Sequence, residues 1–200
     1  MSRLFTDQDG AERLLDDQGE LIFYPSAFTD DDVLLERLTH DIPWSRHQLR
    51  LYGKQLLAPR LSAWFGDPGC HYAYSGIVLE AQPMPPLLLS MRERLVTLTG
   101  HDFNSVLLNL YRDGRDSMSW HADDEPELGP APIIASVSLG ATRRFRLRKK
   151  ADHQQTVGIE LTSGSLLMMQ PPLQQYWQHA VPKTKVVRGA RINLTWRQIL

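Results

Sequence analysis

Two histidines and one aspartate are the residues of this sequence best suited to hold a metal ion. His121 and Asp123 stand two positions apart, and in an extended segment residues at that spacing project from the same face. His179 lies much further along, among aromatic and apolar residues. Two imidazoles and one carboxylate make the facial triad that suits non-haem ferrous iron and leaves coordination positions open. A three-ligand catalytic zinc site uses the same residue types, so the ligands alone leave both metals open.

A second group of polar residues predicts a site for a dicarboxylic acid. The segment 191–197 alternates polar and apolar residues, so its polar side chains share one face of an expected strand. These polar residues are Arg191, Asn193, Thr195 and Arg197. Two guanidiniums on a half-buried face need an anionic partner, and guanidinium groups bind carboxylates bidentately. Asn109 and Tyr111 repeat the spacing on another expected strand and offer an amide and a phenol to the same ligand. A solvent-facing edge strand is the alternative for the two arginines.

The elements expected to position these residues are mostly short strands. Apolar and β-branched runs between turn residues predict strands over 21–24, 106–111, 133–139, 145–148, 157–161, 165–169 and 191–196. Two helices are expected over 30–39 and 87–98. Thr29 is the expected N-cap of the first helix, while Pro86 begins the second and Gly100 ends it.

This order of elements predicts an α+β, mainly β fold. Many short strands in the C-terminal half, after two helices, indicate a double-stranded β-helix (jelly roll) with two flanking helices. Neither a repeat nor a low-complexity linker interrupts the chain, so residues 1–200 are expected to form a single domain. Within it we expect a loose N-terminus over 1–20, a lid over 45–84 and the jelly-roll core over 104–200.

Composition limits the classes of function. The 200 residues carry a formal net charge of −1, with 42% hydrophobic and 22% charged residues, as in ordinary soluble domains. This charge argues against coating nucleic acid by bulk electrostatics but allows local grip on a few phosphates. No apolar run approaches the roughly 20 residues of a membrane helix, and the N-terminus lacks a signal peptide's apolar core. With Cys70 as the single cysteine, we expect a cytoplasmic protein without membrane contact. No heptad pattern suggests association, so we expect a monomer.

Four motifs together resemble the AlkB family of Fe(II)/2-oxoglutarate-dependent nucleic-acid dealkylating dioxygenases, in particular its duplex-DNA-acting members. The motifs are NLYRDG at 109–114, WHADDE at 120–125, PIIASVSLG at 132–140 and RINLTWR at 191–197. The resemblance extends over roughly residues 50–200 and implies that His121, Asp123 and His179 bind iron rather than zinc. It likewise implies that 2-oxoglutarate is held by Asn109, Tyr111, Arg191, Asn193, Thr195 and Arg197.

The resemblance also implies an activity. With Fe(II) bound, 2-oxoglutarate and O₂ would be converted to succinate and CO₂ while an N-alkylated base is oxidised and its methyl group leaves as formaldehyde. The expected lesions are of the 1-methyladenine and 3-methylcytosine type in DNA, with RNA as a further substrate class.

Charge and resemblance together indicate which residues bind the substrate. Methylation at N1 of adenine or N3 of cytosine makes the base cationic, and a carboxylate in the pocket would favour it. Asp124 and Glu125 directly follow the metal-binding pair, although an exposed acidic turn is the alternative for both.

Aromatic residues of the expected lid are further candidates for substrate binding. The segment HYAYSG at 71–76 contains Tyr72, Tyr74 and Ser75, and it resembles the family segment whose aromatic stacks on the target base. We expect Tyr74 to stack on the base with His121 opposite, core packing being the alternative. Tyr52 resembles the hairpin wedge that fills the gap left by a flipped base, with an ordinary hairpin tip as the alternative. Expected phosphate contacts are Arg60, Arg143, Arg148 and Lys149.

Three other interpretations stay open at this point. A related 2-oxoglutarate oxygenase that hydroxylates a protein or a small molecule would share every metal and cosubstrate residue. A non-catalytic binding module would keep the fold without turnover. A structural β-sandwich would explain His121 and Asp123 as a hydrogen-bonded pair at a strand end.

Overall fold

Antiparallel strands dominate the computed structural model, which describes residues 10–46, 48–51, 54–74, 77–186 and 189–200. Seven strands of the described chain form one sheet, in the order β1 (Glu12–Asp16), β2 (Glu20–Tyr24), β13 (Ser165–Gln170), β10 (Ile134–Gly140), β15 (Arg191–Arg197), β8 (Ser105–Tyr111) and β5 (Leu61–Gly66). Four more form a second sheet, in the order β12 (Thr156–Leu161), β11 (Arg143–Lys149), β14 (Trp177–Val181) and β9 (Met118–His121). The seven-stranded sheet is called the large sheet below, and the four-stranded sheet the small sheet. The two sheets confirm the mainly β, jelly-roll prediction.

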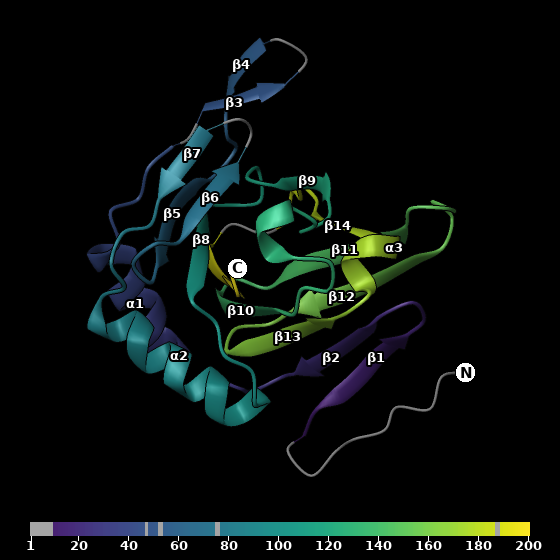
Figure 1. The fold of residues 1–200 in the computed structure, drawn as a ribbon, viewed down its shortest axis with the longest axis horizontal. Helices are drawn as coiled ribbons and strands as arrows, with labels where there is room; N and C mark the ends of the chain where they lie inside the picture. The colour runs from purple at the N-terminus through teal and green to yellow at the C-terminus, as the bar shows by residue number, and fades with distance from the viewer. Residues whose placement is uncertain (1–9, 47, 52–53, 75–76, 187–188) are drawn as a thin grey trace.

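Two helices cover the outer face of the large sheet, as Figure 1 shows. They are α1 (Asp31–Asp41) and α2 (Pro86–Thr99). The prediction for α2 is confirmed, because Pro86 begins it and Gly100 follows it with φ 72° and an N–H that donates to Val96 O. The predicted N-cap of α1 is wrong by one residue: Asp30 is the N-cap and its side chain makes no capping hydrogen bond.

The N-terminal part of the chain is more ordered than the sequence predicts. Residues 1–20 were expected to be loose, yet Glu12–Asp16 forms β1 and pairs with β2 at one end of the large sheet. Residues 1–9 lie outside the described part of the chain.

The expected lid over 45–84 contains two hairpins separated by a core strand. The hairpins are β3 (Gln48–Leu51) with β4 (Lys54–Leu57), and β6 (His71–Tyr74) with β7 (Ile77–Glu80); both project at the same end of the molecule in Figure 1. Between them, β5 pairs with β8 as part of the large sheet. The lid prediction is therefore wrong for Leu61–Gly66.

The central strand β15 separates two buried layers. Ile192, Leu194 and Trp196 face α1 and α2 and pack in one core cluster. Residues 191, 193, 195 and 197 face the opposite way, toward the small sheet, and all seven residues of β15 are buried. Because β15 lies between β10 and β8, the edge-strand alternative for its two arginines is wrong.

Short elements complete the connections near the small sheet. A one-turn helix, α3 (Leu173–Tyr176), directly precedes β14, and a 3₁₀ helix, η1 (Pro126–Leu128), follows β9 after a short irregular segment. No helix among the described residues has the length and apolar character that crossing a membrane requires.

Candidate metal centre

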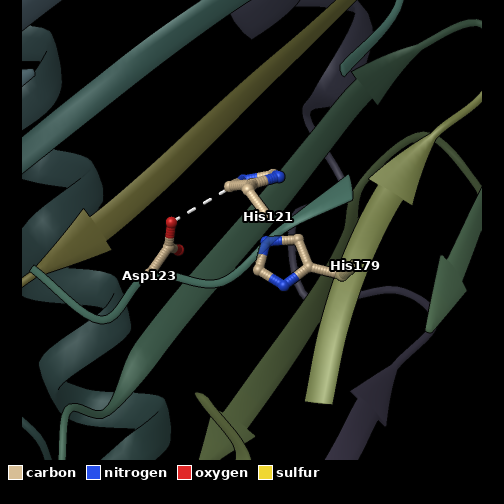
Figure 2. Close-up of side chains that lie close together, drawn as sticks. All are labelled: His121, Asp123 and His179. Atoms are coloured by element: carbon tan, nitrogen blue, oxygen red, sulfur yellow. Dashed lines mark ion pairs between the residues drawn. The ribbon is translucent and has the colours of Figure 1, made fainter. Parts of the chain in front are cut away.

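The small sheet brings the two histidines together. His121 ends β9 and His179 lies in β14, and the two are direct partners in the antiparallel ladder. Their ring centroids are 4.2 Å apart with the rings inclined at 63°. Asp123 lies just beyond β9, and one ligand atom from each of the three side chains falls within 4.8 Å of the others (Figure 2). The sequence prediction that these three residues converge is confirmed.

Asp123 has a free ligand atom at this cluster. Its Oδ1 accepts from Arg197 Nη2 at 3.0 Å and lies 3.7 Å from His121 Nε2. Its Oδ2 is buried and has no hydrogen-bond partner, which is costly unless a ligand supplies one. Burial alone would raise the pKa of Asp123, but Arg197 and the two imidazoles outweigh it and lower the pKa to about 2. The carboxylate is therefore ionised and fits a cation.

The two imidazoles can each present a ring nitrogen to a metal. His179 is buried and its ring stacks on Phe145, with centroids 5.2 Å apart. Burial, helped by the charges of His121 and Arg197 and opposed by Asp123, lowers the pKa of His179 to about 3, so its ring is neutral near pH 7. His121 Nδ1 lies 2.9 Å from Ser119 O, and because a carbonyl only accepts, Nδ1 carries the proton. Its Nε2 lies 3.7 Å from Asp123 Oδ1 and is the ring nitrogen left for a metal.

Arg191 fits the anionic partner predicted for this strand. The residue is 1% exposed, and its Nη2 donates to Ser138 Oγ at 2.9 Å. Its Nε and Nη1 have no acceptor among the described residues, and its guanidinium lies 5.2 Å from the centre of the Tyr111 ring. Burial lowers the pKa of Arg191 to about 10, which leaves it charged. A carboxylate would accept hydrogen bonds from these two unpaired nitrogens and balance the charge of the buried guanidinium.

A single cavity joins the metal cluster to most of the predicted cosubstrate residues. Beside His121, Asp123 and His179, its walls include Asn109, Tyr111, Asn193, Thr195 and Arg197. Apolar side chains close the rest of it, among them Leu107, Met118, Phe145 and Val181. The structure therefore brings five of the six predicted cosubstrate residues to the cavity that holds the predicted metal ligands, while Arg191 is not part of its wall.

Four of these residues already have hydrogen-bond or ion-pair partners in the protein, namely Asn109, Asn193, Thr195 and Arg197. Asn109 Oδ1 accepts from Arg60 Nε at 2.7 Å, so its amide nitrogen is the end left for a ligand. Asn193 Nδ2 donates to Ser136 Oγ and to Val137 O, and its Oδ1 accepts from Thr195 Oγ1 at 3.2 Å. Arg197 pairs with Asp123 and also lines the cavity, so its contact with the dicarboxylate stays a prediction.

Two predicted phosphate contacts are wrong. Arg60 is 4% exposed and donates to Asn109 and to Ser117 O, inside the fold. Arg143 is 2% exposed and donates to the carbonyl oxygens of residues 113, 116 and 182. Neither guanidinium faces solvent, where a phosphate backbone would lie.

The other predicted substrate residues are not part of the described cavity wall. Asp124 is exposed and its Oδ2 pairs with Lys150 Nζ at 2.9 Å, while Glu125 is half-buried. Only the backbone of Tyr72 and Tyr74 is described, as part of β6. Tyr52 and Ser75 lie outside the described residues. Arg148 and Lys149 are half-buried on β11, where Arg148 lies over Trp120 and Lys149 pairs with Asp17.

Two residues of the site escape sequence reasoning. Phe145 alternates with arginines in β11, which indicates an inward aromatic but not its contact with His179. Gln174 belongs to no recognisable sequence pattern, yet its Oε1 accepts from the backbone N–H of Asp123 at 3.0 Å.

Comparisons with known proteins agree with this geometry. A family profile described as "2OG-Fe(II) oxygenase superfamily" matches residues 25–197. The chain is 44% identical over 177 residues to human alpha-ketoglutarate-dependent dioxygenase alkB homolog 3, covering 84% of the chain and 61% of the relative. It is 42% identical over 160 residues to the mouse DNA oxidative demethylase ALKBH2, covering 76% of the chain and 67% of the relative.

A solved structure shares the fold. "The structure of OsALKBH1" superposes with a TM-score of 0.64 at 19% identity, covering 92% of the chain and 99% of that structure. Against the homolog 3 proteins the chain spans less than their full length, 59% of the rat protein and 61% of the human one.

Proposed function

The chain belongs to the 2OG-Fe(II) oxygenase superfamily and, within it, to the AlkB family, and on that premise we propose that it removes alkyl groups oxidatively from nucleic-acid bases. Fe(II), 2-oxoglutarate and O₂ are the cofactor and cosubstrates of this superfamily. The observation that carries the proposal is the convergence of His121, Asp123 and His179 within 4.8 Å, in one cavity with five of the six residues expected to hold 2-oxoglutarate.

Different residues would bind the metal and 2-oxoglutarate. The two imidazoles and the ionised Asp123 would hold Fe(II) from one side, which leaves the side facing the cavity open. When bound, the ion supplies the oxidation of the alkyl carbon together with 2-oxoglutarate and O₂. Arg191 would bind the distal carboxylate of 2-oxoglutarate through Nε and Nη1, which have no acceptor in the described protein, beside the Tyr111 ring. The apolar side chains of the cavity wall exclude water from the reacting atoms.

The proposed products follow from the balance of the reaction. One O₂ places one oxygen atom in succinate, formed as 2-oxoglutarate loses CO₂, and the other on the methyl carbon of the base. The resulting hemiaminal breaks its C–N bond, which releases formaldehyde and the unmodified base. The proposed lesions are 1-methyladenine and 3-methylcytosine in DNA, with RNA as a further substrate class.

Asp124 is our proposed recognition residue for the positive charge of such a base. Its carboxylate stands next to the metal ligand Asp123 in sequence and is exposed, and it already binds one cation, the ammonium of Lys150. Glu125, Tyr72, Tyr74, Ser75 and Tyr52 stay proposals from the family resemblance, as does an Arg148 contact to phosphate.

The test is turnover on matched oligonucleotides. Single- and double-stranded DNA and RNA, each with one 1-methyladenine or 3-methylcytosine, are incubated with Fe(II), 2-oxoglutarate and O₂, and formaldehyde and succinate are quantified. We expect equal amounts of the two products with the wild-type chain, and none with His179→Ala. The matched control, His153→Ala, changes an exposed histidine and should retain turnover. Consumption of 2-oxoglutarate with a protein or metabolite, but with no methylated strand, would refute the proposal in favour of the related oxygenase.

A further inference from the structure

Asp123 is the one metal-ligand candidate that no β-ladder holds in place. His121 and His179 are register partners of β9 and β14, so the sheet itself sets their separation. Asp123 comes after β9 ends, in an irregular segment that leads to η1. Its position must therefore depend on contacts made by other side chains.

Among the described residues, Arg197 and Gln174 are the side chains within 3.0 Å of Asp123, and they act on different parts of the residue. Arg197 binds the carboxylate at 3.0 Å and balances its charge. Gln174 accepts from the backbone N–H at 3.0 Å and so determines where the main chain of Asp123 lies. The carboxylate can rotate about its own bonds, whereas the backbone contact fixes the point from which it starts.

The environment of Gln174 leaves its amide a single orientation. The residue is 2% exposed, and the N–H of Asp123 can only donate, so the amide oxygen must face it. The amide nitrogen then lies 3.5 Å from Met169 Sδ, a weak acceptor in the cavity wall. Both ends of the buried amide are thus engaged, which holds the side chain rigidly.

Gln174 also connects the two segments that carry the metal ligands. It lies in α3, which leads directly into β14 and His179. Its partner Asp123 follows β9 and His121. Without this hydrogen bond, a shift of α3 would move His179 relative to His121 and Asp123.

We propose that Gln174 is a positioning residue for the metal centre, which acts through Asp123 by holding its backbone N–H. The inference rests on the proposed function in one respect, namely that His121, Asp123 and His179 hold a divalent metal. Partners that orient a metal ligand typically change metal affinity by about 10–100-fold when removed. We expect a loss of that size when the acceptor oxygen of Gln174 is removed or withdrawn.

The experiment uses the full metal-free chain and Co(II), a probe that binds without turnover. Gln174→Leu removes the acceptor at similar volume, and Gln174→Asn keeps a buried amide but withdraws its oxygen by one methylene. Gln175→Leu is the matched control, because it makes the same change at the next residue of α3, where the side chain is exposed. Calorimetric titration gives the Kd for Co(II), the visible absorption of bound Co(II) reports the ligand geometry, and circular dichroism melting reports the fold.

The expected result is a Kd for Co(II) raised about 10–100-fold in both Gln174 variants, with an altered visible spectrum at saturation. Gln175→Leu should match the wild type in both measurements. Folded Gln174 variants with wild-type Kd and spectrum would overturn the inference, and so would two variants that do not fold, since the residue would then serve the fold. A wild-type chain that binds no Co(II) would instead refute the metal site of the proposed function.

Discussion

Arg197 and Asp123 form an ion pair of 3.0 Å inside the protein, with side chains 6% and 3% exposed. The pair joins β15, a central strand of the large sheet, to the segment that follows β9 of the small sheet. It counteracts the rise in the pKa of Asp123 that burial alone would cause, so the carboxylate is ionised and can bind a cation. The pair therefore serves both the stability of the fold and the charge of the metal centre.

Replacing Arg197 by Met should leave the buried carboxylate uncompensated. We expect the free energy of unfolding of the metal-free protein to fall by about 3–5 kcal/mol in urea denaturation. Co(II) should restore part of this loss, because a bound cation replaces the missing positive charge. Arg144→Met is the matched control on the exposed face of β11, where the pair with Glu160 is solvated, and it should change stability by less than about 1 kcal/mol. Equal losses in the two variants would contradict the role of the pair.

Arg191 and Arg143 are both buried beside Tyr111 but should respond oppositely to replacement by Met. Arg143 satisfies three carbonyl oxygens, so Arg143→Met should lower the free energy of unfolding by about 3 kcal/mol. Arg191 leaves two nitrogens without acceptors, so Arg191→Met should leave the ligand-free protein as stable as the wild type or more stable.

Binding of 2-oxoglutarate separates the same two variants. Arg191→Met should weaken binding of 2-oxoglutarate to the Co(II)-loaded protein by at least about tenfold, measured by calorimetry, since a buried charge pair is lost. Arg143→Met should retain binding under conditions where it is folded. Retained affinity in Arg191→Met would show that another residue takes the distal carboxylate.

Acid should destabilise the metal-free protein through His179. Its pKa is about 3 in the folded chain against an ordinary value of 6.5, so below pH 6.5 the unfolded chain binds a proton that the folded chain does not. The contribution of His179 is therefore complete above pH 6.5 and is lost as the pH falls toward 3, by about 1.4 kcal/mol per pH unit. Urea denaturation between pH 7 and 4.5 should show this slope in the wild type.

The control for this pH dependence is a change of histidine. His179→Gln should flatten the slope over the same range, whereas His153→Gln, at an exposed position, should leave it unchanged. A wild-type slope in His179→Gln would show that other groups cause the acid sensitivity. Asp123 contributes separately, because its lowered pKa makes its stabilisation disappear only as the pH falls from about 4 toward 2.

The sequence predicted which side chains share a face of a strand better than it predicted which residues they contact. Alternation along 191–197 correctly placed two arginines on one buried face, because the strand period of two is a local property. The same alternation could not show that Arg197 meets Asp123 while Arg191 does not, since that depends on what lies across the sandwich. The pairing of His121 with His179 likewise follows from the order of strands in the small sheet.

Elements that depend on tertiary partners were the ones missed. β1 has weak alternation and is a strand because β2 pairs with it. Residues 61–66 lie inside the range predicted as the lid, yet the pairing of β5 with β8 places them in the large sheet. Gln174 carries no spacing signal at all, because its importance comes from one contact 51 residues away.

The pair of Asp124 and Lys150 offers a test of base recognition with opposite outcomes. If Asp124 binds a cationic methylated base, Asp124→Asn should raise the KM for a 1-methyladenine oligonucleotide by about fivefold, while Lys150→Met, which frees the carboxylate, should lower it. The KM for 2-oxoglutarate should stay unchanged in both, since neither residue lines the cavity. Shifts of the oligonucleotide KM in the same direction would reject Asp124 as the recognition residue.

Two glycines with nearly the same backbone conformation should tolerate alanine very differently. Gly100 and Gly164 have φ of 72° and 74°, a region that disfavours any side chain. A Cβ at Gly100 meets no atom within 4 Å, so Gly100→Ala should lower the free energy of unfolding by about 1–2 kcal/mol, from backbone strain alone.

At Gly164 the same Cβ would meet the backbone oxygen of Phe28. That segment is held close by two backbone hydrogen bonds, from Phe28 N to Gly164 O at 2.9 Å and from Gly164 N to Ser138 O at 2.8 Å. Gly164→Ala must therefore push the chain before α1 away from the large sheet, and it should lower the free energy of unfolding by at least about 3 kcal/mol. Urea denaturation of the two variants measures the difference, and equal losses would mean that strain, rather than close packing of this segment, sets the requirement for glycine.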